Sequence, residues 1–171
     1  MANSADGAAL FAEHREGVLR YLTRVVGPGE AARDLTQEVF LRVSRAGVPA
    51  ADATGQRAWV FKIARNLALN HVRDRQRVPP TTAMVDVPRG GTQELGLAVR
   101  QALLALDAVD RDVFLLRESA GLSYDEISAA CDLSADAVRN RLHRARMQLR
   151  EHLGNAMQFQ LQRGIRLTQG Q

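Results

Sequence analysis

The chain has 171 residues, enough for one ordinary domain or two small ones, and 46% of them are hydrophobic while only 5% are aromatic. Such a core must consist mostly of Leu, Val and Ala, which favours packed helices over a β-sandwich. The formal net charge is +4, and Lys62 is the only lysine, so nearly all of the positive charge is arginine. Clustered arginine is typical of proteins that bind nucleic acid, although a GC-rich genome produces the same bias.

Several classes of protein are disfavoured by the composition. The single cysteine, Cys131, excludes an internal disulfide, and the four histidines lack metal-ligand spacing, so we predict no metal site and no cofactor. No apolar run approaches the length of a membrane span, and Asp6, Glu13 and His14 interrupt the apolar core that a signal peptide would need. We therefore expect a protein that does not insert into membranes and stays in the reducing cytoplasm.

A first helical domain is predicted over residues 8–77. Its first helix is amphipathic and stops at the Gly-Pro-Gly sequence of residues 27–29. A second helix follows, and a loop predicted over residues 47–55 separates it from a third. The third helix is expected from about Gln56 to about Arg75.

The third helix is apolar around most of its circumference, and we expect Trp59 and Phe61 to lie in the core. The remaining sector is polar, which indicates either a strip that faces a polar partner or a plain solvent-exposed stripe. The basic run that ends at Arg77 favours nucleic acid. The side chains of this sector are Lys62, Asn66, Asn70 and Arg73, with Arg65 at its margin.

The middle and the end of the chain differ in character. Residues 78–93 contain three prolines and two glycines without sustained periodicity, and are therefore predicted to be a flexible linker. Helical periodicity resumes near Glu94, which predicts a second domain over residues 94–153. Gly154 is typical of a helix C-cap, and the glutamine-rich tail of residues 154–171 is expected to hold one or two further helical turns, without an assigned role.

Residues 121–150, GLSYDEISAACDLSADAVRNRLHRARMQLR, predict two helices joined by a tight turn. Ser123 and Glu126 have the spacing of a capping box for the first helix, and Ser134 is a candidate N-cap for the second. Cys131 is expected on the buried face of the first helix as a small core residue. This pattern is typical of a helix-turn-helix, in which the second helix enters the major groove of DNA.

The second helix of this pair separates into a buried and an exposed face. A narrow apolar stripe is predicted to pack against the domain, and it contains Val138, Leu142, Ala145 and Leu149. Five arginines and one acidic residue lie between Ser134 and Arg150, which favours a DNA-binding face over a solvated amphipathic helix, the alternative interpretation. The residues that point away from the stripe or flank it are Asp136, Arg139, Asn140, His143, Arg144 and Arg150, with Arg141 and Arg146 nearer its edges.

Both halves of the chain resemble extracytoplasmic-function sigma factors of bacterial RNA polymerase. ARDLTQEVFLRV (32–43) and AWVFKIARNLALNHVRDRQR (58–77) are similar to sigma region 2, and RDVFLLRESAGLSYDEISAACDLSADAVRNRLHRAR (111–146) is similar to region 4. The resemblance implies an all-α fold of two small helical domains on a flexible linker. Two departures are Asp107, where the family usually has proline, and Asp132, where it often has glycine; Asp tolerates a left-handed backbone better than most residues.

The resemblance also implies a function and residue roles. The protein is expected to bind core RNA polymerase through the β′ clamp helices and the β flap, to recognise the −10 and −35 promoter elements, and to promote DNA melting, without enzymatic activity. An anti-sigma factor is implied as an inhibitory partner. The implied polymerase-binding residues are Asp34, Gln37, Glu38, Phe40 and Leu41. The implied −10 contacts are Lys62, Arg65, Asn66, Asn70 and Arg73, and the implied −35 contacts are Asp136, Arg139, Asn140, Arg141, His143 and Arg144.

Two other functions remain as alternatives. A helix-turn-helix regulator, whose N-terminal block senses a ligand or dimerises, would bind a palindromic site without polymerase, but it gives no reason for the motifs of residues 34–43 and 58–77. An enzyme would need a nucleophile and a base, for which His71, Asp74 or the serines around Ser123 are the candidates. The sequence contains no recognisable arrangement of that kind and no phosphate-binding loop.

Overall fold

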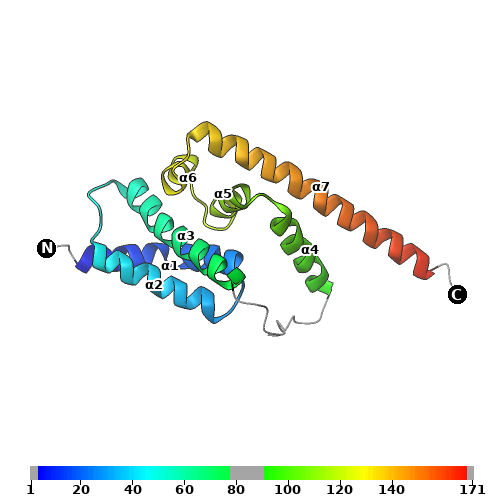
Figure 1. Cartoon of the computed structure of the whole chain (residues 1–171), viewed down its shortest axis with the longest axis horizontal. Coiled ribbons are helices and arrows are strands. Elements are labelled where there is room, and N and C mark those ends of the chain that lie inside the picture. Colours follow the sequence, from blue (N-terminus) through cyan, green and yellow to red (C-terminus); the bar gives the residue numbers. More distant parts are fainter. Residues whose placement is uncertain (1–3, 78–90, 169–171) are drawn as a thin grey trace. The chain divides into compact units, whose positions relative to one another are not determined.

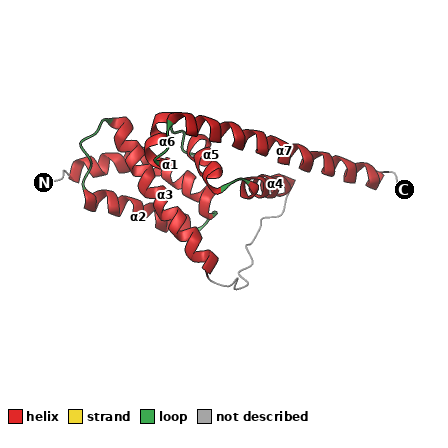
Figure 2. Cartoon of the chain, turned by 45° about the horizontal axis from the view of Figure 1, so that its top comes forward, coloured by secondary structure: helices red, strands yellow, loops and turns green. Residues whose placement is uncertain are grey.

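The structure is a computed structural model that describes residues 4–77 and 91–168, with side chains at residues 7–77 and 96–154. All regular secondary structure in these ranges is helical (Figures 1 and 2), which confirms the predicted all-α fold. The predicted linker lies outside the described residues from 78 to 90, and a helix begins at Gly91, inside the range predicted for that linker. The helices are α1 (Ser4–Val26), α2 (Glu30–Ala46), α3 (Ala53–Arg77), α4 (Gly91–Ala105), α5 (Ala108–Glu118), α6 (Tyr124–Cys131) and α7 (Ala135–Thr168).

The helices form two compact units. The first unit contains α1, α2 and α3 together with residues 115–139, and therefore includes α6 and the first turn of α7. The second unit contains α4, the part of α5 up to Phe114, and α7 from Asn140 onward.

In the first unit, α1 packs against α2 and α3, and α2 packs against α3. Val18, Tyr21 and Leu22 of α1 are fully buried at helical spacing. The rings of Tyr21 and Phe61 meet edge to face with their centroids 6.3 Å apart. Gly17 permits this close approach, because a Cβ atom there would lie 3.3 Å from Cζ of Phe61. The prediction that Phe61 is a core residue is therefore confirmed.

The helix boundaries of this unit follow local backbone chemistry. Gly27 and Gly29 have φ angles of 96° and 132°, a region that side chains disfavour, and they separate α1 from α2 where the sequence predicted a break. The start of α3 lies at Ala53, three residues before the predicted start. Asp52 explains the difference, since its Oδ1 accepts a hydrogen bond from the backbone N–H of Gly55 at 2.8 Å and so caps the helix.

The second unit has a small apolar core between α4 and α7. The buried residues Ala102, Leu106, Ala145 and Leu149 form it, and Leu103, Phe114 and Leu153 cover it partly. The prediction that α7 ends near Gly154 is wrong, because the helix continues to Thr168. A glycine inside a helix costs only about 1 kcal/mol relative to alanine, which is too little to stop a helix by itself.

Candidate nucleic-acid interface

Residues 132–134 form a tight turn between two capped helices, α6 and α7, as the sequence predicted. Ser123 Oγ accepts from the N–H of Glu126 at 3.2 Å, and the Glu126 carboxylate accepts from the N–H of Ser123 at 2.7 Å, so the capping box is complete. Asp132 ends α6 in the left-handed conformation, with φ 55° and ψ 45°. Ser134 Oγ accepts from the N–H of Ala137 at 3.2 Å at the start of α7. The geometry is that of a helix-turn-helix.

The buried side of this motif is also the predicted one. Val138, Leu142, Ala145 and Leu149 of α7 are all buried, and so is Cys131. Within the first unit, Leu116, Leu122, Ile127 and Ala130 are buried as well. The apolar stripe therefore determines which side of α7 faces away from the protein.

The exposed side of α7 carries the predicted −35 residues, which differ in their partners. Asp136 and Arg139 pair with each other at 2.6 Å, one helical turn apart. Asn140 and His143 are exposed, and neither has a side-chain hydrogen bond or ion pair to another described residue. These two side chains are available to a ligand without breaking an existing contact.

Arg141 and Arg144 converge on one carboxylate, that of Asp110 in the first turn of α5. Arg144 Nε donates to Asp110 Oδ2 at 2.5 Å and Nη2 donates to Oδ1 at 3.0 Å, while Arg141 Nη1 donates to Oδ1 at 2.7 Å. Asp110 is 0% exposed, whereas the side chain of Arg144 is 53% exposed. The hydrogen bond from Arg144 lowers the pKa of Asp110 most strongly; burial opposes this effect and Arg141 adds to it.

Asp107, the departure from the family's usual proline, supports the same cluster. Its Oδ1 accepts from the backbone N–H of Val109 at 3.0 Å and of Asp110 at 3.4 Å, so it caps the N-terminus of α5. It also lies 3.6 Å from Nη1 of Arg141. Two carboxylates and two guanidinium groups therefore meet between the start of α5 and α7.

The predicted −10 strip lies on the outer side of α3. Asn66 and Asn70 are exposed, and Arg73 Nη2 donates to Oδ1 of Asn70 at 2.7 Å. Lys62 donates to Oδ1 of Asp132 at 2.7 Å, so a predicted DNA contact is paired with the turn of the helix-turn-helix. Arg65 is half-buried at the margin of this strip.

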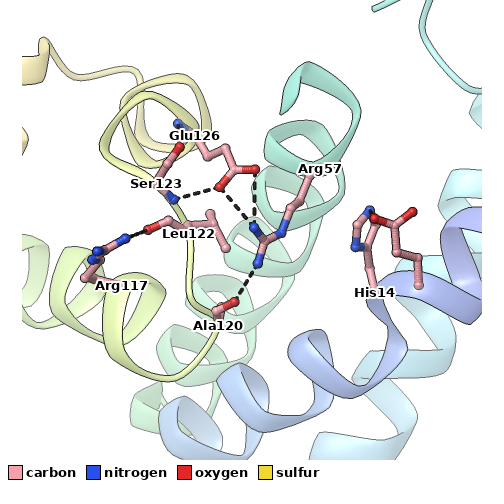
Figure 3. Close-up of polar contacts among 8 residues, drawn as sticks. His14, Arg57, Arg117, Ala120, Leu122, Ser123 and Glu126 are labelled. Carbon is pink, nitrogen blue, oxygen red and sulfur yellow. Dashed lines mark hydrogen bonds and ion pairs between the residues drawn. The ribbon is translucent and has the colours of Figure 1, made fainter. Parts of the chain in front are cut away.

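Arg57, near the start of α3, is the centre of the polar contacts between α3 and α6 (Figure 3). Its Nη1 donates to the two carboxylate oxygens of Glu126 at 3.4 and 3.2 Å, and its Nη2 donates to the carbonyl of Ala120 at 2.8 Å. The Glu126 side chain is 7% exposed. One buried carboxylate thus caps α6 and binds α3.

His14 of α1 lies near this centre (Figure 3) and is buried. Burial lowers the pKa of its imidazole; the charge of Glu13 opposes that shift, and the charge of Arg57 adds to it. His14 is therefore held towards its neutral form in the folded protein.

The predicted polymerase-binding residues of α2 differ in exposure. Asp34, Gln37 and Leu41 are exposed, and Glu38 accepts from Nε of Arg42 at 2.7 Å. Phe40 lies beneath this surface, since it is buried and its ring meets that of Phe11 edge to face at 4.9 Å.

A surface pocket of about 450 Å³ lies between α2 and α3. Arg42, Arg45, Ala46, Trp59 and Ile63 line it. Trp59 is therefore not wholly a core residue, contrary to the prediction, because one part of its indole borders this pocket.

Other kinds of site find no support within the described residues. No group of three or more His, Cys, Asp or Glu side chains is arranged to hold a metal ion there. His71 Nε2 is buried without a hydrogen-bond partner, while Asp74 pairs with Arg77 at 4.0 Å, so these candidates do not form a catalytic pair. None of the described helices is both long and apolar enough to cross a bilayer.

Asp110 and Arg57 were not among the predicted site residues, although each holds a charged partner from a distant part of the sequence. Arg57 meets Glu126 across 69 residues, and Asp110 meets Arg144 across 34 residues. No spacing rule connects residues so far apart. Only the acidic residue in the first turn of a helix and the capping-box glutamate gave a local signal that these carboxylates matter.

Comparison with known proteins agrees with this arrangement. Residues 10–78 match Sigma-70 region 2, and residues 96–149 match Sigma-70, region 4. ECF RNA polymerase sigma factor SigE of Mycolicibacterium smegmatis is 34% identical over 155 residues, which are 84% of this chain and 60% of SigE, so the chain spans less than two thirds of that relative. ECF RNA polymerase sigma factor SigC of Mycobacterium tuberculosis is 31% identical over 156 residues, or 85% of this chain and 83% of SigC.

A solved structure gives the same result for the fold. The structure of CnrH, in complex with the cytosolic domain of CnrY, superimposes with a TM-score of 0.68 at 27% identity, and the match covers 90% of each chain. The two sigma regions occur in the expected order, and SigC is matched over most of its length. The chain therefore belongs to the extracytoplasmic-function sigma factors of RNA polymerase.

Proposed function

We propose that this protein binds core RNA polymerase, recognises the −10 and −35 elements of a promoter, and promotes melting of the DNA for transcription initiation. The observation that carries the proposal is the presence, in one chain, of a capped helix-turn-helix with an arginine-rich outer face and a second helix, α3, with an exposed amide-rich strip. A regulator that acts without polymerase needs only the first of these surfaces.

The α2 surface is the proposed contact with the β′ clamp helices of polymerase. Asp34 and Gln37 are exposed beside Leu41, which is 49% exposed. A mixed apolar and polar patch of this kind is typical of protein interfaces that form and dissociate. Region 4 is proposed to contact the β flap as well as the −35 element.

The α3 strip is the proposed contact with the −10 element. Asn66 and Asn70 offer amide donors and acceptors to the edges of unstacked bases, while Arg73 and Lys62 offer charge to phosphates. Binding to separated strands more tightly than to the duplex lowers the free energy of the open state, so melting needs no covalent chemistry. We therefore propose a protein without enzymatic activity, located in the cytoplasm.

A protein partner other than polymerase is also proposed, of the anti-sigma type. The support is that CnrH, which shares the fold at 27% identity, was solved in complex with the cytosolic domain of CnrY. The surfaces that polymerase and DNA would use are exposed in this chain, so a partner that covers them would inhibit both.

The first test is co-purification with bacterial core RNA polymerase, followed by run-off transcription from a promoter pool. We expect a stable complex and new promoter-specific transcripts. Failure to bind core polymerase, together with tight binding to duplex DNA alone, would move the protein to the regulator class and contradict the proposal.

Two variants separate the proposed surfaces. Glu38→Arg should weaken polymerase binding, with Glu16→Arg on α1 as a matched charge reversal at an exposed site. Asn66→Ala should leave polymerase binding intact and reduce transcription from −10-dependent promoters, with Gln76→Ala as the matched control on the same helix. Equal loss of both activities in Asn66→Ala would contradict the assignment of α3.

A further inference from the structure

Building on the proposed function, we propose that Asp110 is a positioning residue, which holds Arg144 so that the free end of its guanidinium group contacts one guanine of the −35 element. The proposal assigns Asp110 a part in base specificity although it is buried and does not touch DNA.

The hydrogen-bond pattern of Arg144 is the main observation. Asp110 accepts from Nε at 2.5 Å and from Nη2 at 3.0 Å, so the carboxylate occupies one edge of the planar group. Arginine has five N–H donors, and the three that remain are both of those on Nη1 and one on Nη2. One N–H of Nη1 and one of Nη2 lie side by side at the outer end of the guanidinium group. Guanine presents two adjacent acceptors, O6 and N7, and arginine binds them through two parallel hydrogen bonds.

Asp110 is buried and Arg144 is exposed, as expected for a buried residue that holds a DNA-contacting side chain. Asp110 is 0% exposed, while the Arg144 side chain is 53% exposed. Arg144 follows Asn140 by four residues, so both lie on the same outward face of α7. The anchored edge of the fork is therefore inside the protein and the rest of the group is accessible to DNA.

The anchor itself is fixed from two other sides. Arg141 Nη1 donates to Asp110 Oδ1 at 2.7 Å, and Asp107 accepts from the backbone N–H of Asp110 at 3.4 Å. A side chain that is already held in its binding geometry loses less conformational entropy when it binds. Arg144 thus meets the duplex with its orientation set beforehand, which favours discrimination between bases.

The charge of the cluster supports orientation over general attraction. Asp107 and Asp110 balance Arg141 and Arg144, so the four groups together have no net formal charge. A phosphate contact contributes to affinity through released counterions and makes binding depend on salt. A neutralised arginine should contribute little to that dependence and more to the choice of base.

The test uses holoenzyme assembled from the full chain and core polymerase, with promoters in which each −35 position is varied in turn. Competitive run-off transcription measures the preference for each base. We expect a preference for guanine of about tenfold at one position, a value within the range for a bidentate contact. Asp110→Asn, Arg144→Ala and the double variant should each reduce that preference to about threefold or less, and preferences at the other positions should remain unchanged.

Two further variants make the result specific. Asp125→Asn is the matched change at an exposed carboxylate of α6 and should leave every preference unchanged. Arg144→Lys keeps the charge but lacks the fork, and should lose the guanine preference even if Asp110→Asn fails to fold.

Three outcomes would overturn the proposal. The first is an unchanged base preference in folded Asp110→Asn, and the second is retention of the guanine preference in Arg144→Lys. The third is a uniform loss of affinity in Arg144→Ala, with a log–log salt slope that is shallower by about one, which identifies a phosphate contact. If the wild-type holoenzyme shows no base preference at any −35 position, the proposed recognition of the −35 element is wrong. If the wild type has such preferences but the variants keep the guanine preference, only the positioning role of Asp110 is wrong.

Discussion

Replacing Arg57 by alanine should destabilise the first unit by about 2 kcal/mol. Removing one partner of a fully buried ion pair costs about 3–5 kcal/mol, whereas an exposed pair contributes about 0–1 kcal/mol. The pair of Arg57 and Glu126 lies between these limits, because the two side chains are 29% and 7% exposed. The carbonyl of Ala120 also loses its side-chain donor, which adds to the cost.

Urea unfolding of the full chain measures this change. The single tryptophan, Trp59, lies on α3 in the same unit, so its fluorescence follows the relevant structure. A double-mutant cycle with Glu126→Gln isolates the pair, since glutamine still serves in a capping box. Arg77→Ala is the matched control, because its pair with Asp74 is exposed and long at 4.0 Å, and it should cost less than about 0.5 kcal/mol.

A stabilising ion pair requires a coupling energy that this cycle can measure. Two groups in direct contact should couple by about 1 kcal/mol or more in this cycle. If the effects of Arg57→Ala and Glu126→Gln add to within about 0.3 kcal/mol, the ion pair does not stabilise the contact between α3 and α6. A loss that equals that of Arg77→Ala would lead to the same conclusion.

Three further predictions concern single groups. Burial lowers the pKa of His14 below its usual 6.5, so the free energy of unfolding should fall as the pH drops below that value. His14→Gln should remove this loss, which urea unfolding at pH 7 and pH 5 can measure. Hydrogen bonding from Arg144 lowers the pKa of Asp110, so the Asp110 carboxylate should stabilise the fold fully above pH 3.8 and lose this effect as the pH falls through the lower pKa of the folded state. Acid titrations followed by circular dichroism should show that the difference in stability between wild type and Asp110→Asn shrinks over that range. Asp132 has a left-handed backbone, which glycine adopts more readily, so Asp132→Gly should raise the free energy of unfolding by about 0.5–1 kcal/mol. The measurement is made in 1 M salt, where the exposed ion pair of Asp132 with Lys62 is screened. A lower melting temperature of the variant would contradict this prediction.

Some expectations were wrong for reasons that a local pattern cannot contain. Gly154 has the residue type of a C-cap, yet α7 continues through it, because one glycine destabilises a helix by only about 1 kcal/mol relative to alanine. Trp59 was expected in the core, but one part of its indole borders the pocket between α2 and α3.

The sequence by itself determined the features that act over one or two turns of helix. The capping box of Ser123 and Glu126 is made within four residues, and the stripe from Val138 to Leu149 follows from helical periodicity. Only the tertiary structure decided that Glu126 also binds Arg57 and that Asp110 holds Arg144. These contacts join residues 69 and 34 positions apart, and their free energy depends on burial and orientation, which arise when helices pack and have no periodic signal in the chain.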